Sequence, residues 1–395
     1  MTISSTFEAI VGTLQQHRRT LWLGQSVDTS VLHASYADFE WLPLLTSVGC
    51  IIRRPKANGE KFDGKLRERI AAKGPLTIDS GGFVLMMNPS LGWNVGHVAD
   101  VYERIDADHL ISLDVPPGPA DGPAVRRRKY EATLSNLAAL IDRVGPRVRP
   151  VAHGATMDEL DRNCRRIAAI VPTPPFIGLG GIVPVLQQCG SVRRPGADTP
   201  QRRIVEAVAC VRSHFPDASL HLFGVGSLNT VIGAFAAGAN SVDSIGWRQA
   251  AGFGSVYIPG RHRRLLTDRD RPTPCRPFIN DEDRALLAQC RCPECRRVHN
   301  DDERITRLAH HFKPRAVHNI WVLYQEAADY LHSLERASVD RFLAKRLSDA
   351  WLDALEAVRL RPPLEIVRRL QANRVPANND ANLLPEFSPA YCLKQ

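Results

Sequence analysis

The 395-residue sequence contains no apolar run of 18 residues, so it offers no segment that could span a membrane as a helix. Its start, from Met1 to Ser5, lacks a basic segment followed by an apolar core, and we therefore expect no secretion signal and no membrane partner. Neither G-x-G-x-x-G nor a Walker lysine pattern occurs, which argues against a cradle for dinucleotides or nucleoside triphosphates. These absences predict a globular protein of the cytoplasm.

Lysine is scarce. Eight lysines among 51 basic residues leave 43 arginines, and the net charge is +9. The planar fork of arginine matches the oxygens of a phosphate, so this composition is typical of a protein with a nucleic-acid partner. A codon preference for arginine would produce the same counts, and composition alone does not choose between the two interpretations.

Paired cysteines are not indicated either, because the nine cysteines are an odd number in a chain without a secretion signal. Cys290, Cys292 and Cys295 form C-x-C-x-x-C, a turn in which thiolates can converge on a metal. We expect one structural zinc per chain, although reduced cysteines in a surface loop are the alternative. Its fourth ligand should be His318, at the start of a helical region. The other nearby candidates are His299, His310 and His311.

Short apolar runs alternate with helical patterns over roughly 230 residues, a size that is typical of a (β/α)8 TIM barrel. Helical patterns cover 125–144, 203–215 and 228–237. A doubly wound open sheet is the alternative, but polar and glycine residues at the strand ends favour the barrel, where such ends meet at one face. The eight predicted strands are 21–24, 49–53, 76–79, 109–114, 148–153, 176–180, 220–224 and 241–245.

The character of the chain changes after the eighth predicted strand, which suggests three regions. We expect a catalytic barrel over 1–260, a zinc-binding subdomain over 261–330 and a C-terminal helical extension with a tail over 331–395. Residues 261–275 are basic and loop-like, residues 319–360 have a helical pattern, and periodicity is lost from Arg374 onward.

Three aspartates follow predicted strands. Asp79 and Asp243 end the third and eighth strands, and a carboxylate pair of this kind can act at the anomeric carbon of a sugar as nucleophile and acid or base. Each could instead cap a helix or form a salt bridge. Asp114 ends the fourth strand, where it could accept hydrogen bonds from the N–H edge of a purine-like base or cap the next turn.

Glycines at further strand ends, in Ser80-Gly81-Gly82, Gly180-Gly181 and Gly224-Val225-Gly226, would let a flat ligand approach the backbone. Phe83 and Phe223 lie beside these glycines and could stack on the two faces of a heterocycle, although lone phenylalanines are usually core residues.

Together these motifs resemble the tRNA-guanine transglycosylase superfamily. The resemblance rests on Asp79-Ser80-Gly81-Gly82-Phe83, Gly224-Val225-Gly226, Asp243 and the cysteine motif with His318-Asn319, in that order, and covers about residues 20–330. It implies a barrel enzyme that exchanges guanine for a 7-deazaguanine by double displacement. In this enzyme Asp243 would be the nucleophile, Asp79 the general acid/base and Asp114 the reader of the guanine edge. The resemblance also implies a base pocket formed by Ser80, Gly81, Phe83, His153, Gly180, Gly181, Phe223 and Gly224.

The sequence departs from the tRNA enzymes at several points. His153 stands where they carry Gln, Ser244-Ile245-Gly246-Trp247-Arg248 follows the aspartate, and Leu23-Gly24-Gln25-Ser26 replaces their Val-Gly-Thr. The stretch Ile182-Val183-Pro184-Val185 lacks the acid that supports an aminomethyl group, which suits the uncharged nitrile of preQ0. The pattern looks closest to the DpdA-type enzymes, which place preQ0 in DNA and have an ATPase partner.

Three other functions stay open: a transglycosylase acting on tRNA, a non-catalytic nucleic-acid-binding paralogue, and a hydrolase on the same barrel. Two arginine groups should hold the phosphates beside the flipped nucleotide: Arg261, Arg263 and Arg264, then Arg296 and Arg297. A solvated basic surface without contacts, or a nucleic-acid track along Arg126-Arg127-Arg128-Lys129, is the alternative.

Overall fold

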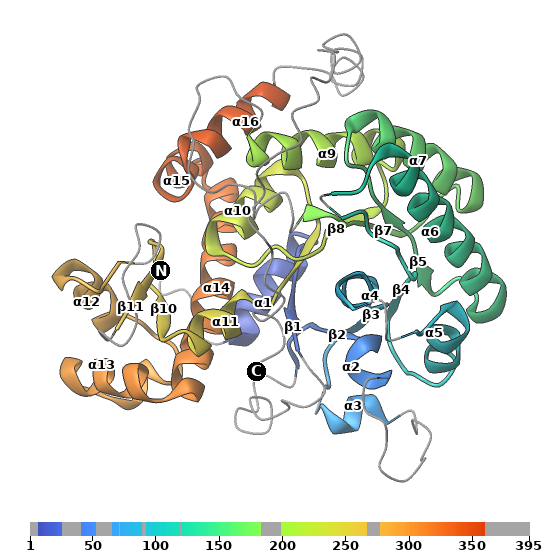
Figure 1. The fold of residues 1–395 in the computed structure, drawn as a ribbon. Helices are drawn as coiled ribbons and strands as arrows, with labels where there is room; N and C mark the ends of the chain where they lie inside the picture. The colour runs from blue at the N-terminus through green and yellow to red at the C-terminus, as the bar shows by residue number, and fades with distance from the viewer. Residues whose placement is uncertain are drawn as a thin grey trace.

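The structure, a computed structural model, describes residues 7–25, 41–52, 65–70, 72–88, 92–118, 120–182, 199–266 and 277–359. Within these residues one parallel sheet of nine strands, in the order β5-β4-β3-β2-β1-β9-β8-β7-β6, curls into a barrel with helices outside it (Figure 1). The predicted α/β barrel is therefore confirmed. The strands are β1 (Thr20–Gly24), β2 (Leu44–Ser47), β3 (Leu76–Asp79), β4 (His109–Ile111), β5 (Val148–Arg149), β6 (Val151–Ala152), β7 (Phe176–Leu179), β8 (Ser219–Leu222) and β9 (Ser241–Ser244).

The ninth strand arises because Pro150 divides the fifth predicted strand into β5 and β6. Proline has no N–H to donate to a sheet, so the regular ladder breaks there. β5 pairs with β4, and β6 pairs with β7. The Pro150 carbonyl still accepts a hydrogen bond of 2.9 Å from Gly178 N in β7. The divided strand thus connects the two ends of the sheet.

The second strand is displaced from its predicted position. The prediction of a strand at 49–53 was wrong: β2 covers Leu44–Ser47, and the helix α2 (Val48–Ile52) follows it directly. Both segments are short and apolar, so periodicity could not separate strand from helix. The pairing of Leu44 with Leu76 and of Ser47 with Asp79 fixes the strand in the sheet.

The helices that cover the barrel begin and end at clear local signals. The predictions at 125–144 and 203–215 were close to the observed helices, and α10 agrees fully with the predicted 228–237. Thr156 caps α7 with Glu159 in a capping box, and Gly238 ends α10 with a φ of 110°. The helices of the barrel are α1 (Phe7–Gln16), α3 (Leu66–Arg69), α4 (Gly82–Met87), α5 (Val95–Tyr102), α6 (Pro123–Val144), α7 (Met157–Ile170), α9 (Pro200–His214), α10 (Leu228–Ala237) and α11 (Gly246–Gly252).

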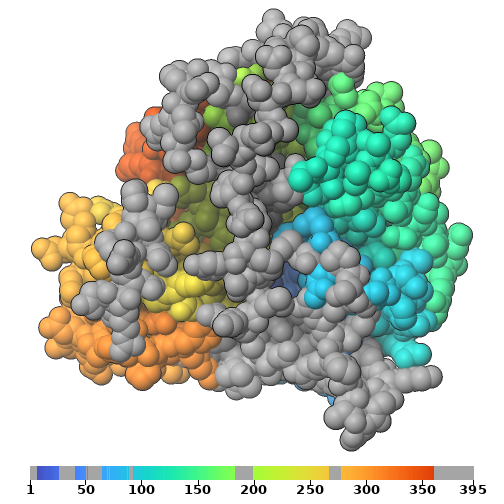
Figure 2. All heavy atoms as spheres, viewed as in Figure 1, coloured from blue at the N-terminus to red at the C-terminus, as the bar shows by residue number. Residues whose placement is uncertain are grey.

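A smaller region follows the barrel and lies on its flank, where its atoms are coloured yellow to orange at the left of Figure 2. The prediction of an irregular segment after residue 261 was wrong in part, because β11 (Arg263–Leu265) pairs with β10 (Ser255–Tyr257). The rest of that segment, 267–275, and the predicted tail from Arg374 lie outside the described residues. Next come α12 (Asp281–Ala288), a short 3-10 helix (Cys295–Arg297) and α13 (Asp301–His310).

The predicted helical region 319–360 consists, in the described residues, of α14 (Phe312–Glu335), which begins before it, α15 (Val339–Arg346) and α16 (Asp349–Arg359). The first break falls at Ala337, whose positive φ of 49° cannot continue a helix. Among the helices of the described part of the chain, none is both long and apolar enough to cross a bilayer.

Candidate active site and metal centre

Asp79 lies at the end of β3, where the chain turns sharply into α4. Gly81 adopts a φ of 81°, and its N–H donates a hydrogen bond of 3.1 Å to Oδ2 of Asp79. Ser47, the partner of Asp79 in β2, also hydrogen-bonds the carboxyl group. Burial, followed by the negative charges of Asp114 and Asp243, raises the pKa of Asp79 to about 7. This carboxyl group can therefore give or take a proton near neutral pH.

Asp114 joins the ends of three strands. Its Oδ1 accepts a hydrogen bond of 3.1 Å from Oγ of Ser80, and its Oδ2 lies 2.8 Å from Nε2 of the buried His153. A Cβ added at Gly82 would lie 2.1 Å from Oδ1 of Asp114, so only glycine allows this approach. The carboxylate is thus held in place by hydrogen bonds rather than capping the following turn.

Two glycines of the seventh strand region make space for the rings of the predicted base pocket. A Cβ at Gly180 would lie 2.1 Å from Cε1 of His153, and a Cβ at Gly178 would lie 2.4 Å from Cε2 of Phe223. Gly178 was not predicted, although a glycine inside a strand often marks such a close approach. The structure therefore brings His153, Gly180 and Phe223 together on neighbouring strands.

Asp243 lies in β9 next to Trp22 of β1. Its Oδ1 accepts a hydrogen bond of 2.7 Å from the N–H of Gly224, whose φ is 75°. Nε2 of the fully buried His221 lies 3.4 Å from the same oxygen, and Nδ1 of His221 lies 2.9 Å from Oγ of Ser241. Asp243 is therefore supported from within the barrel.

Sequence reasoning missed His221 and Ser47 as supports of the two carboxylates. His221 lies two residues before Phe223, so both side chains face the same side of β8, and this period of two was the available signal. Ser47 was missed because the strand that carries it was placed too late in the chain. A carboxyl group with a pKa near neutrality, within the electrostatic influence of a second, hydrogen-bonded carboxylate, is an arrangement that can support nucleophilic displacement at a sugar.

Phe83 and the glycines at the turns complete the predicted pocket. Phe83 is 43% exposed at the start of α4, directly after the Asp79 turn. Gly181 has a φ of 78° and lies at the end of β7, beside His153. The stretch that continues from Ile182, residues 183–185, lies outside the described residues.

The predicted arginines differ in what they contact. Arg261 and Arg264 form ion pairs with the fully buried Asp283, so they connect β11 and the turn before it to α12. Arg296 and Arg297 are both exposed, and Arg297 also pairs with Glu294. Arg263 is exposed and lines a hollow of about 360 Å³ together with Gly226, Ser227 and Gly246, which follow β8 and β9.

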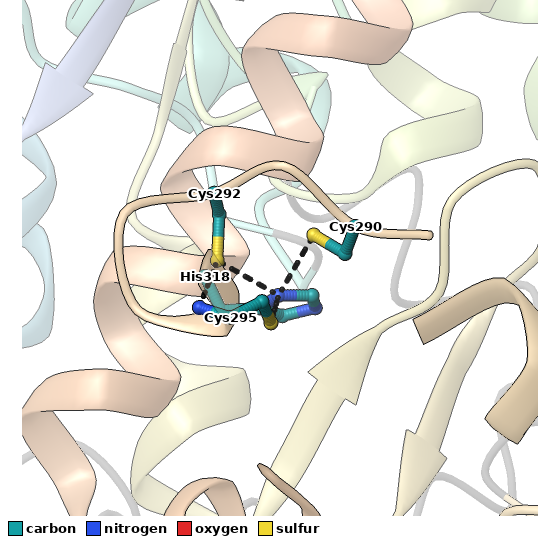
Figure 3. Close-up of side chains that lie close together, drawn as sticks. All are labelled: Cys290, Cys292, Cys295 and His318. Atoms are coloured by element: carbon teal, nitrogen blue, oxygen red, sulfur yellow. Dashed lines mark hydrogen bonds between the residues drawn. The ribbon is translucent and has the colours of Figure 1, made fainter. Parts of the chain in front are cut away.

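Cys290, Cys292, Cys295 and His318 converge in the core of the small region (Figure 3). The three sulfur atoms lie 3.5, 3.5 and 3.4 Å from Nδ1 of His318, and all four possible ligand atoms lie within 4.8 Å of one another. These separations suit a tetrahedral ion with Zn–S bonds of about 2.3 Å. The cluster could therefore hold a metal.

The other ring nitrogen of His318 supports this interpretation. Nε2 donates a hydrogen bond of 2.7 Å to the carbonyl of Tyr257, which leaves the lone pair of Nδ1 directed at the sulfurs. Asn319 next to it accepts a hydrogen bond of 2.8 Å from Tyr257 N. Donor set, tautomer and geometry fit zinc, and an ion there would connect α14 to β10 and to the cysteine turn.

Removal of two metal ligands tests this centre. We expect the double substitution Cys292→Ser and Cys295→Ser to lose one equivalent of zinc per chain, as measured by elemental analysis of the purified protein. The melting temperature should fall too, because metal binding stabilises the folded form. His310→Gln, an exposed histidine at the end of α13 and outside this centre, is the control and should keep all zinc. Retention of that zinc equivalent by the double variant would contradict the ligand assignment.

Comparison with known proteins agrees with this geometry. The sequence model of a family described as queuine tRNA-ribosyltransferase matches residues 38–350. A tRNA-guanine(15) transglycosylase of Pyrococcus abyssi is 23% identical over 312 residues, which are 77% of this chain and 47% of that protein. One of Archaeoglobus fulgidus is 21% identical over 283 residues, 69% of this chain and 52% of that protein. The chain thus spans about half the length of these relatives. Because the family match covers most of its residues, the chain belongs to the queuine tRNA-ribosyltransferase family.

Proposed function

We propose that the chain exchanges a guanine base in a nucleic acid for a 7-deazaguanine base by double displacement. The observation that carries this proposal is the juxtaposition of two different carboxylates at the barrel strand ends. Asp243 is anchored by the hydrogen bond from Gly224 N and lies 3.4 Å from Nε2 of His221, whereas Asp79 has a pKa raised to about 7. The family membership and the names of the two relatives support the same chemistry.

In the first half-reaction the carboxylate of Asp243 attacks C1′ of the target nucleoside. A bond forms between C1′ and the carboxylate oxygen, the bond from C1′ to N9 breaks, and its electron pair leaves with the guanine. Protonated Asp79 gives its proton to the departing base. In the second half-reaction Asp79 takes the proton from the incoming base, whose nitrogen attacks C1′ and releases Asp243. No water is consumed, so the sugar–phosphate backbone of the nucleic acid stays intact.

Base selection belongs to the pocket around Asp114. Its carboxylate can accept from the N–H edge of a guanine-type base, and Ser80 and His153 keep both of its oxygens in position. Phe83 and Phe223 would stack on the ring, with Gly81, Gly180, Gly181 and Gly224 shaping the pocket walls. Zinc at Cys290, Cys292, Cys295 and His318 would supply a structural cross-link.

We propose preQ0 as the incoming base and DNA as the polymer, on the departures from the tRNA enzymes at His153 and after Gly181. An ATPase of the same modification system would then be the partner. The tRNA alternative has support of its own, because both relatives are named as tRNA enzymes. Incubation with labelled preQ0 and either plasmid DNA or total tRNA, followed by nucleoside analysis, decides the polymer. Label in neither polymer would contradict the exchange reaction with this base.

Salt dependence of binding tests how the polymer is held. Each lost phosphate contact should lower the log–log slope of affinity against salt by roughly one. We expect Arg263→Ala and Arg296→Ala to flatten the slope, because these arginines are exposed. Arg261→Ala and Arg264→Ala should act mainly through lost pairing with Asp283.

The control for these arginine variants is Arg147→Ala, an exposed arginine just before β5, at the opposite end of the strands. An unchanged slope in the first two variants would place the track elsewhere, with Arg127 and Arg128 tested next.

His221 should act as a positioning residue for the nucleophile. His221→Phe keeps a ring between Phe176 and Phe223 but removes both polar contacts, to Ser241 and to Asp243. We expect kcat to fall by roughly 10- to 100-fold while KM for the free base changes little, because the substitution keeps a ring against Phe223 of the base pocket. Single-turnover measurement of adduct formation checks the step. A normal rate would show that Gly224 alone orients Asp243.

A further inference from the structure

A second cluster of metal-binding side chains lies outside the barrel, between α7 and α9, far along the chain from the cysteine turn. Asp161, Cys210 and His214 bring one carboxylate oxygen, one sulfur and one ring nitrogen within 4.8 Å of one another. Asp161 and Cys210 are buried, with 6% and 2% of their surfaces exposed. The two helices pack directly on each other (Figure 1).

The helical spacing directs these donors to one point. Cys210 and His214 are four residues apart on α9, so their side chains lie on the same face of that helix. Asp161 and Cys164 are three residues apart on α7 and face them. Cys164, which is fully buried, hydrogen-bonds to Cys210 and is the next donor available. Three donors from two helices thus meet at one place at the edge of the core, with the thiol of Cys164 next to that of Cys210.

We propose that Asp161, Cys210 and His214, with Cys164 beside them, form a second zinc site that connects α7 to α9. Thiolate, imidazole and carboxylate are the ligand types that zinc takes in proteins. Binding would release the thiol proton of Cys210 to water and use the neutral form of His214. Nε2 of His214 lies 2.9 Å from Oδ1 of Asp161, and a tetrahedral ion needs these atoms about 3.3 Å apart, a small side-chain movement.

The surroundings of Asp161 also suit a bound ion. Its second oxygen, Oδ2, pairs with Arg165, one helical turn further along α7. A ligand carboxylate is commonly held by such an outer partner, which fixes the oxygen that binds the metal. An Asp161–His214 ion pair would need neither thiol, whereas a metal site uses the cysteine on each helix.

Zinc content of the full-length protein tests the proposal. After incubation with excess zinc and removal of unbound metal, we expect Cys210→Ser and His214→Gln each to contain one equivalent less than the unmodified chain. His214 is partly exposed near the end of α9, so His214→Gln should keep the fold, which circular dichroism checks. Ser213→Ala, on the same helix, is the matched control and should keep all zinc. Equal zinc content in all four proteins would overturn the proposal, as would a disulfide between Cys164 and Cys210 in the isolated protein.

Discussion

Asp243→Asn should abolish the covalent adduct between the protein and its nucleic acid and lower base exchange by roughly 10⁴-fold or more. An amide oxygen is a far weaker nucleophile than a carboxylate. The hydrogen bond from Gly224 N can still form to the amide oxygen, so the fold should stay intact. The measurement is denaturing electrophoresis of the protein with labelled substrate, in parallel with an exchange assay.

Asp217→Asn serves as the matched control for this variant. Asp217 is exposed and lies just before β8, at the opposite end of the strands from the proposed site. We expect normal adduct formation from it. Full activity of Asp243→Asn would rule out a double displacement through this residue and leave direct exchange as the mechanism.

Asp79→Asn should lower exchange by roughly 10²- to 10⁴-fold, because the amide can neither protonate the departing guanine nor deprotonate the incoming base. The nucleophile remains in this variant. In the unmodified enzyme we expect the rate profile to show an ionisation near pH 7, the value to which burial and the two neighbouring aspartates raise the pKa of Asp79. Near-normal exchange in the variant would exclude the acid/base role.

The same substitution, which lowers activity, should raise the stability of the folded protein above neutral pH. The pKa of Asp79 is about 7 in the folded protein against 3.8 ordinarily, so the folded form holds a proton that the unfolded form has lost between these values. Stability therefore falls as pH rises from about 4 to 7. Asp79→Asn removes this loss. We therefore expect its free energy of unfolding, relative to that of the unmodified protein, to be higher at pH 8 than at pH 4 by on the order of a few kcal/mol. Denaturant titration at both pH values measures the difference.

Strand ends and metal ligands were visible in the sequence because each has a local signature. Asp79, Asp114 and Asp243 each follow an apolar run, and the cysteine spacing marks its own turn. The support of these groups depends on pairing between strands, which no local pattern contains. His221 reaches Asp243 from the neighbouring strand, and Ser47 reaches Asp79 through the register of β2 with β3.

Other features were hidden for different physical reasons. The division of the fifth strand follows from the missing N–H of Pro150. The proline is visible in the sequence, but apolar residues on both sides of it predict one continuous strand. The ion pairs of Arg261 and Arg264 depend on Asp283, which lies about 20 residues further along the chain in α12. The donors on α7 and α9 come from two helices separated by a strand, so only their packing places Asp161 beside His214.

The long helix α14 supplies contacts that the N-terminal elements need to complete their packing. Phe7 of α1 packs edge-on against Trp321 at a ring separation of 4.8 Å, and the hydroxyl of Tyr324 donates to the carbonyl of Leu21 in β1. These contacts join residues that are more than 300 positions apart, and such contacts form slowly because a very long loop must close first. During synthesis, the first strand and first helix must wait for the last third of the chain before their packing is complete. Truncation before Trp321 would thus leave the beginning of the barrel, and not only its end, without these partners.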